Sequence, residues 1–343
     1  MISESDTVFM REALELALRG RGLTNPNPMV GAVLVRDGEV IGRGYHHRAG
    51  MPHAEIEALN DARSRGEATF GAELFVTLEP CSTAGRTGPC TEAILGAGIG
   101  RVVIGCVDPN PRHAGRGAEL LRRAGVEVCS GVLERECAAI NYSFFKWIVS
   151  GRPFVTLKLA TTLDGRIATA SGCSKWITGE AARSRVQELR RMADAIMVGG
   201  GTLRCDRPGL TVREPADWPR QPLRIVATRR SMSESELREF FPDGRAETAN
   251  LPDAAAWDAF LVGLGRRDMV NLLIEGGGEL AASALSARAV DRVEFHIAGK
   301  ILGGRDSRPA VGGVSPASLS EALKLRDVEV RRLGDDVMIA GGL

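Results

Sequence analysis

Apolar positions in the first half of the chain alternate between strand-like and helix-like spacing. Short apolar runs bounded by turn residues indicate strands, and apolar residues three or four positions apart indicate helices. Asp37-Gly38 separates two apolar runs, which is typical of a β-hairpin. This alternation predicts a layered α/β domain. The expected strands are Val30–Arg36, Val40–Gly44, Glu73–Leu78, Arg101–Val107 and Val126–Cys129, and the expected helices are Met10–Leu18 capped by Asp6, Pro52–Ala62, one that begins at Cys90, Gly117–Arg123 and Leu133–Val149.

The second half repeats the same alternation after a break. Ser150-Gly151-Arg152-Pro153 reads as a boundary, so we expect two domains, residues 1–150 and 151–343. Residues 231–256 are polar and predict no element. The remaining pattern predicts strands at Phe154–Ala160, Ala195–Val198, Arg224–Thr228, Asn271–Ile274 and Val290–Ile297, and helices at Gly179–Met192 and Glu279–Leu285.

Composition narrows the class of protein. With 343 residues and 44% hydrophobic residues, the chain has enough apolar material for two cores. The formal net charge of +1 does not favour nucleic acid as a partner. No apolar stretch approaches the roughly 18–20 residues of a membrane span, so we expect no membrane partner. An odd number of cysteines, 7, argues against a disulfide framework, and the expected location is cytoplasmic. The sequence is compatible with a homo-oligomer but does not give the oligomeric state.

The sharpest chemical pattern combines one histidine with two cysteines. His53-Ala54-Glu55 stands at an expected helix start, Pro80-Cys81 at a strand end and Pro89-Cys90 at another helix start. One imidazole and two thiolates suit zinc, which in catalytic sites keeps a fourth position for water. Glu55 can reach a water there and move its proton. Each cysteine alone fits a core position equally well, so the prediction depends on the joint pattern.

Further segments accompany this pattern. Zinc-dependent nucleoside and base deaminases carry His-x-Glu with Pro-Cys-x-x-Cys, but here eight residues separate the two cysteines. With that spacing the segments resemble the bacterial riboflavin-biosynthesis family diaminohydroxyphosphoribosylaminopyrimidine deaminase / 5-amino-6-(5-phosphoribosylamino)uracil reductase. They are Asn25-Pro26-Asn27-Pro28-Met29-Val30-Gly31, Thr77-Leu78-Glu79-Pro80-Cys81, Gly85-Arg86-Thr87-Gly88-Pro89-Cys90 and Asp108-Pro109-Asn110-Pro111.

The resemblance implies a cytidine-deaminase-like three-layer domain in the first half. It implies that His53, Cys81 and Cys90 hold zinc and that Glu55 moves the proton. Amide and carboxylate side chains can read a pyrimidine edge, and arginine can pair with a phosphate. Three of the implied positions neighbour proline and fit ordinary turns equally well. The implied substrate contacts are Asn27, His46, Arg86, Asp108 and Asn110.

The second half carries two glycine triplets, Gly199–Gly201 and Gly276–Gly278, each directly after a strand. Such turns let backbone N–H groups approach a phosphate, although neither triplet fits G-x-G-x-x-G. Lys158 shares a strand face with Thr156 and Ala160, which fits a cation facing a ligand. An edge-strand lysine in water is the commoner explanation for that pattern.

The resemblance continues through Leu157-Lys158-Leu159-Ala160, Ser174-Lys175-Trp176-Ile177-Thr178-Gly179, Asp206-Arg207-Pro208 and Glu275-Gly276-Gly277. It implies a dihydrofolate-reductase-like fold that binds NADPH. Lys158 would be catalytic as well as a substrate contact. Arg190 and Arg213 suit a phosphate clamp, and surface charge is the alternative for both. The implied substrate contacts are Lys158, Ser174, Arg190, Leu210, Arg213 and Glu275, and the implied cofactor contacts are Ala160, Trp176, Thr202, Asp206, Gly277, Gly278 and Ser283.

The sequence therefore predicts a bifunctional enzyme that takes a small phosphorylated pyrimidine, with Zn²⁺ in one domain and NADPH in the other. One alternative is a zinc deaminase of another base or of nucleic acid with a non-catalytic C-terminal domain. A second is a binding module with structural zinc, although Glu55 and three rather than four ligands disfavour it. A third keeps the fold and loses one activity.

Overall fold

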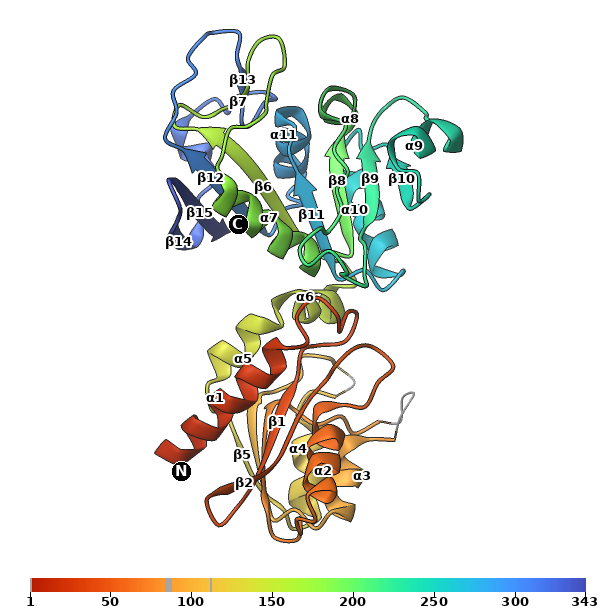
Figure 1. Ribbon diagram of the computed structural model, residues 1–343, viewed down its shortest axis with the longest axis vertical. Helices are drawn as coiled ribbons and strands as arrows, with labels where there is room; N and C mark the ends of the chain where they lie inside the picture. The colour runs from red at the N-terminus through yellow and green to blue at the C-terminus, as the bar shows by residue number, and fades with distance from the viewer. Residues whose placement is uncertain (1, 84–87, 112) are drawn as a thin grey trace. The chain divides into compact units, whose positions relative to one another are not determined.

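The computed structural model describes residues 2–83, 88–111 and 113–343 (Figure 1). The chain divides into two compact units, unit 1 up to Gly151 and unit 2 from Arg152 onward. Among the described residues, no helix combines the length and the apolar character that crossing a bilayer would need.

Unit 1 is built on a five-stranded mixed sheet with the order β2-β1-β3-β4-β5. β1 pairs antiparallel with β2 and β3, whereas β3, β4 and β5 run parallel. Asp37 and Gly38 join β1 to β2 with φ values of 51° and 80°, the left-handed pair that a two-residue hairpin turn requires, so the predicted hairpin is confirmed. The strands are β1 (Gly31–Arg36), β2 (Glu39–Tyr45), β3 (Glu73–Leu78), β4 (Arg101–Cys106) and β5 (Glu127–Ser130).

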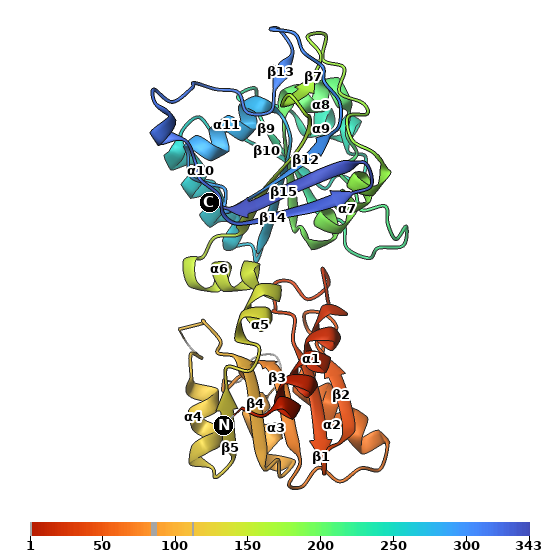
Figure 2. The same ribbon diagram turned by 90° about the vertical axis from the view of Figure 1, so that its left-hand side faces the viewer.

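Helices cover both faces of this sheet, which confirms the expected three-layer domain (Figures 1 and 2). Alternate strand residues face opposite layers: Leu34 packs in the cluster of α2, α3 and α4, while Val33 and Val35 pack in the cluster of α1, α5 and α6. The first layer contains α2 (Ala54–Ser64), α3 (Cys90–Gly96) and α4 (Arg116–Arg123), and the second contains α1 (Glu4–Leu18), α5 (Glu134–Ile140) and α6 (Tyr142–Ser150).

Two helix predictions in unit 1 need correction. Ser3, not Asp6, caps α1: the Ser3 hydroxyl accepts from the Asp6 N–H, and the Asp6 carboxylate accepts from the Ser3 N–H. The helix expected over Leu133–Val149 is two helices, because Asn141 at φ −115° and ψ 18° interrupts it. The Asn141 side chain bonds the backbone of another loop instead of continuing one helical face.

Unit 2 is built on an eight-stranded sheet with the order β10-β9-β8-β11-β6-β12-β15-β14. The strands from β10 to β12 run parallel, and β15 and β14 add an antiparallel edge. The strands are β6 (Phe154–Thr162), β8 (Ala195–Gly199), β9 (Leu223–Ala227), β10 (Ala246–Ala249), β11 (Asn271–Glu275), β12 (Arg292–Ala298), β14 (Arg326–Leu333) and β15 (Asp336–Gly342), with the short pair β7 (Arg166–Ala168) and β13 (Arg308–Pro309) forming a separate ribbon.

Helices also cover both faces of this sheet. One layer, with Val155, Leu157 and Trp257 in its core, contains α10 (Ala254–Gly265) and α11 (Gly278–Ser286). The other contains α7 (Glu180–Met192), α8 (Gly200–Asp206) and α9 (Glu234–Phe240). Unit 2 also contains a short 3₁₀ helix, η1 (Leu319–Glu321). Residues 231–256, which the sequence left unassigned, supply α9, β10 and the start of α10.

Candidate functional sites

Three potential metal ligands converge at the carboxyl end of β3 in unit 1. His53 is the N-cap residue of α2, Cys81 follows β3, and Cys90 is the first residue of α3. His53 Nδ1 lies 3.6 Å from Cys81 Sγ and 3.3 Å from Cys90 Sγ, and the three ligand atoms all lie within 4.8 Å of one another. One nitrogen and two sulfurs at this separation fit a tetrahedral zinc ion with a fourth position left for another ligand.

Hydrogen bonds within this cluster favour a thiolate. The Cys90 side chain, and then the His53 ring, lower the pKa of Cys81 to about 4. The Cys90 backbone N–H also donates to Cys81 Sγ at 3.3 Å. The contact with Cys81 in turn raises the pKa of His53. The contact with Cys81 and burial raise the pKa of Cys90, so Cys81 is the sulfur that is already ionised and Cys90 gives up its proton when a metal binds.

Glu55 lies in the first turn of α2, two residues after His53, and lines the same pocket. Its side chain is buried, and burial raises its pKa. Within the described residues, the cluster of potential metal ligands consists of His53, Cys81 and Cys90 and does not include Glu55. A buried carboxylate beside the metal ligands can accept a proton and release it again, which is the role of a general acid/base.

The structure brings most of the expected substrate contacts of unit 1 together. Asn27, His46, Asp108 and Asn110 line the pocket that contains Glu55, and Arg86 falls outside the described residues. The His46 ring bonds the Pro52 carbonyl through Nδ1 at 2.9 Å, so Nδ1 carries the proton. Nε2 can then accept from Asn27 Nδ2 at 3.0 Å, which leaves the Asn27 amide oxygen as an acceptor for a ligand.

Two further residues hold this pocket in shape, and neither was a predicted contact. Glu79 is buried, and its carboxylate accepts from the backbone N–H groups of Asp108, Gly115 and Ala118 at 2.9–3.2 Å. Asn141 accepts from the Met29 N–H and donates to the Met29 carbonyl, both at 2.8 Å. Glu79 lies inside a motif quoted for the resemblance, whereas no local signal marks Asn141, 112 positions from its partner.

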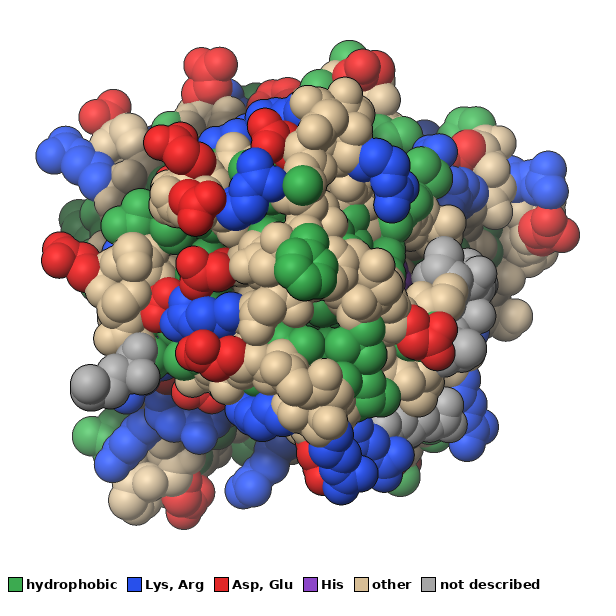
Figure 3. All heavy atoms as spheres, turned by 90° about the horizontal axis from the view of Figure 1, so that it is seen from below, with side chains coloured by type: hydrophobic (Ala, Val, Ile, Leu, Met, Phe, Trp, Pro, Cys, Tyr) green, Lys and Arg blue, Asp and Glu red, His purple; other side chains and the backbone are tan. Residues whose placement is uncertain are grey.

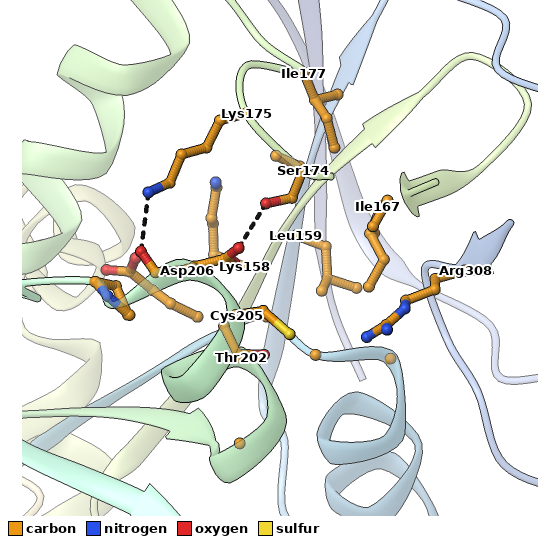
Figure 4. Close-up of a pocket in the computed structure, with 18 of the residues that line it drawn as sticks. Lys158, Leu159, Ile167, Ser174, Lys175, Ile177, Thr202, Cys205, Asp206 and Arg308 are labelled. Atoms are coloured by element: carbon orange, nitrogen blue, oxygen red, sulfur yellow. Dashed lines mark hydrogen bonds between the residues drawn. The ribbon is translucent and has the colours of Figure 1, made fainter. Parts of the chain in front are cut away.

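Unit 2 contains a larger pocket at the carboxyl ends of its parallel strands (Figure 4). Lys158 projects into it from β6, which lies between β11 and β12, so the edge-strand explanation is wrong. Within the described part of the chain, its ammonium makes no hydrogen bond and no ion pair within 4 Å. The ammonium is therefore a free donor for a ligand.

Glu275 and two arginines lie beside Lys158. Arg190 donates to both Glu275 oxygens at 2.6 and 2.7 Å and to the Thr211 carbonyl at 3.0 Å, so its surface-charge alternative is wrong and most of its donors are occupied. Arg213 is exposed and lines the pocket, and its guanidinium makes no hydrogen bond to any residue that the structure describes. The free phosphate donor of the expected pair is therefore Arg213.

The pocket lining also includes Ser174, an expected substrate contact, and several expected cofactor contacts. Ser174 donates to the Asp206 carboxylate at 2.8 Å, and Lys175 donates to the Asp206 carbonyl at 2.9 Å (Figure 4). Trp176 is 65% exposed and stacks under Arg183, with 4.9 Å from the guanidinium carbon to the ring centroid, so it is not a core residue. The same lining contains Ala160, Thr202, Gly277 and Gly278.

Two expected contacts do not line this pocket with their side chains. Leu210 is buried in the hydrophobic cluster under α8 and α9. The Ser283 hydroxyl accepts from the Trp257 indole N–H at 3.0 Å, on the side of α11 that faces the core. A sequence motif marks a position in the chain but not the direction of its side chain, so neither orientation was predictable.

Family models match both units. Residues 153–339 match the RibD C-terminal domain, and residues 3–106 match the cytidine and deoxycytidylate deaminase zinc-binding region. The first match disfavours an unrelated non-catalytic domain in the second half. A riboflavin biosynthesis protein RibD of Aquifex aeolicus (strain VF5) is 41% identical over 359 residues, which cover 99% of each chain.

Solved structures of similar proteins match this chain over nearly its full length. RibD of Acinetobacter baumannii is 35% identical with a TM-score of 0.89, and 99% of each chain is covered. A diaminohydroxyphosphoribosylaminopyrimidine deaminase/5-amino-6-(5-phosphoribosylamino)uracil reductase of Thermotoga maritima is 37% identical with a TM-score of 0.88, and 98% of each chain is covered. With two such pockets on two such units, the chain belongs to the RibD family of bifunctional riboflavin-biosynthesis enzymes, in which a zinc-binding deaminase region precedes a reductase domain.

Proposed function

We propose that unit 1 deaminates 2,5-diamino-6-(5-phosphoribosylamino)pyrimidin-4-one by hydrolysis and that unit 2 reduces the ribosyl group of the product to ribityl with NADPH. The domains assigned to the two steps are residues 1–150 and 151–343. The observation that carries the proposal is the pairing of two pockets in one chain: a His–Cys–Cys cluster beside buried Glu55, and a free Lys158 ammonium beside Glu275.

In the deamination, His53, Cys81 and Cys90 would hold zinc, which when bound activates water near neutral pH. Glu55 accepts the proton of the attacking water and delivers it to the departing ammonia. Asn27, Asp108 and Asn110 supply amide and carboxylate groups that distinguish ring nitrogens from carbonyl oxygens. Burial of Glu55 keeps bulk water from competing for the proton.

In the reduction, NADPH when bound supplies the hydride. The C1′–O4′ bond of the ribosyl ring breaks as O4′ takes a proton, which leaves an open-chain protonated imine, and the hydride then forms the new C–H bond at C1′ and neutralises the nitrogen. One NADPH and one proton are consumed. The Lys158 ammonium faces the pocket as a donor for that proton, and Arg213 can pair with the substrate phosphate.

We also propose a cytoplasmic location. All seven cysteines are free, two of them within the metal cluster that needs reduced thiols. Acidic and basic side chains are both present across the face drawn in Figure 3, which gives no support to nucleic acid as the substrate there.

The test follows ammonia release and NADPH absorbance separately on the intact enzyme. Glu55→Gln should retain zinc by metal analysis and lose ammonia release by at least about a hundredfold. Lys158→Ala should slow NADPH oxidation with the deaminated substrate and spare ammonia release. If Glu55→Gln released ammonia at the normal rate, or if Lys158→Ala slowed both reactions equally, the assignment of two separate sites would be wrong.

A further inference from the structure

Three charged residues lie side by side across the sheet of unit 2. In the strand register, Glu275 of β11 pairs with Lys158 of β6, and Lys158 pairs with Glu294 of β12. Register partners in a parallel sheet project from the same face. Lys158 therefore stands between two carboxylates, on the face that α7 covers.

Glu294 is fully buried and is held from two sides. Arg185 of α7 donates to both of its oxygens at 3.0 Å, and His296, two residues along β12, bonds Oε1 through Nε2 at 2.8 Å. These bonds hold the pKa of Glu294 at about 2, against the effect of burial, so the carboxylate stays charged. The arrangement repeats the pair of Arg190 with Glu275 on the other side of Lys158.

We propose that Glu294, held by Arg185 and His296, is a positioning residue for the reductase step, which keeps the Lys158 ammonium charged and directed into the pocket. This inference rests on the proposed function of unit 2. Each carboxylate flanking Lys158 is already paired with an arginine, so neither binds the ammonium directly. The field of the two carboxylates stabilises the charge while the donor itself stays free for the substrate.

The charge state of Lys158 depends on the balance between burial and the charges of its neighbours. Burial lowers its pKa, Glu275 and Glu294 raise it, and Arg190 lowers it. His296 has a lowered pKa because of burial, so it is neutral and adds no charge of its own. Its Nδ1 has no partner among the described residues. The charged or titratable groups around Lys158 are Glu275 from β11, Glu294 and His296 from β12, Arg190 from α7, and Asp206, Lys175 and Arg213 on the pocket wall. Arg185 of α7 is bonded to Glu294.

The experiment measures the pH dependence of kcat/KM for NADPH oxidation by the intact enzyme. Activity that needs the charged ammonium falls as pH rises through the Lys158 pKa. Glu294→Gln removes one negative charge with little change in shape, and the alkaline limb should move down by about one pH unit. Arg185→Gln removes the opposing cation, and the same limb should move up. Opposite shifts cannot arise from general damage to the fold.

A matched control is Glu188→Gln, because Glu188 is the other carboxylate on Arg185, at 2.7 Å, and lies toward solvent. Its alkaline limb should stay in place, as should that of Glu294→Asp, which keeps the charge. Chemical denaturation reports whether unit 2 of each variant is folded, and ammonia release, assigned to unit 1, should stay unchanged. An unmoved limb in Glu294→Gln overturns the inference. If that variant does not fold, an Arg185→Gln limb that stays or moves down overturns it instead. A wild-type enzyme without NADPH oxidation would contradict the proposed function itself.

Discussion

Asn141 holds one wall of the unit 1 pocket in place, although it lies 112 positions along the chain from the residue that it contacts. Its amide makes two 2.8 Å bonds to Met29, which follows the Asn27 turn, and the side chain is buried. Asn141→Ala leaves a buried N–H and a buried carbonyl unpaired, which costs about 1–3 kcal/mol in the free energy of unfolding. We expect a raised KM for the pyrimidine in deamination and an unchanged reductase KM, by steady-state kinetics.

Asn60→Ala is the matched control, because the exposed Asn60 side chain on α2 accepts from Arg63 at 3.2 Å and has no other side-chain hydrogen bond to a described residue. It should leave both KM values and the denaturation midpoint close to wild type. A deaminase KM in Asn141→Ala equal to that of the control would mean that Met29 does not position the Asn27 turn.

The different roles of Arg190 and Arg213 could not be predicted from the sequence. The sequence supported equal roles for Arg190 and Arg213, since either guanidinium can pair with a phosphate. In the structure Arg190 is committed to Glu275 and the Thr211 carbonyl, while Arg213 faces the pocket unpaired among the described residues. The difference comes from a strand 85 positions away, and no local pattern encodes it.

At the scale of elements, helix α2 depends on a glycine in the neighbouring strand. A Cβ at Gly44 of β2 would lie 2.3 Å from the Ala54 carbonyl oxygen and 2.3 Å from the Ala58 nitrogen, both backbone atoms. Gly44→Ala must push α2 away from the sheet, and we expect the free energy of unfolding to fall by about 1–3 kcal/mol. Because α2 begins beside His53, zinc bound per chain should fall as well.

Gly96→Ala provides the comparison for that change. Gly96 ends α3, and nothing lies within 4 Å of a Cβ placed there, so the substitution should be neutral or stabilising by up to about 1 kcal/mol. Chemical denaturation with metal analysis measures both variants. Equal stability and zinc content in the two would show that the close approach of α2 to β2 is unimportant.

The order of elements was predictable because their signals are local. Apolar runs gave β3 at its observed bounds, and Asp37-Gly38 gave the hairpin. The edge strand β14 and its neighbour β15 were not predicted, and β14 is mostly exposed. The break at Asn141 and the internal position of β6 depend on partners distant in sequence. Metal ligands with helix-start signals were therefore easier to identify than residues that hold other residues in place.

A partly buried ion pair whose strength depends on pH joins helix α1 to the sheet. Arg101 of β4 contacts both Asp6 oxygens, at 2.8 and 2.9 Å, and lowers the pKa of Asp6 from 3.8 to about 2. A depressed carboxylate pKa adds stability above pH 3.8 that is lost as pH falls toward 2. The expected contribution at pH 7 is about 2 kcal/mol.

Asp6→Asn keeps the side-chain shape and removes the charge. The difference in unfolding free energy between wild type and Asp6→Asn should be largest above pH 5 and should shrink steadily toward pH 3, in urea titrations at each pH. A difference that stays constant over this range would mean that the Arg101 pair does not account for the anchoring of α1.

At the scale of the whole molecule, each unit contains the cores that its own pocket needs. Two hydrophobic clusters draw their residues from unit 1 and two from unit 2. The metal ligands and Glu55 all lie before Gly151, and the residues named around Lys158 all lie after it. Each unit is also large enough to fold as an independent domain.

We therefore expect separate chains of residues 1–151 and 152–343 to fold and to divide the two reactions. The first should bind zinc and release ammonia, and the second should oxidise NADPH with the deaminated substrate, each with kcat/KM within about tenfold of the intact enzyme. Circular dichroism establishes folding before activity is compared. A folded fragment that is inactive alone and recovers when the other fragment is added would show that its site needs groups from both units. Two folded, active fragments would show that joining the reactions in one chain is not required for the chemistry of either.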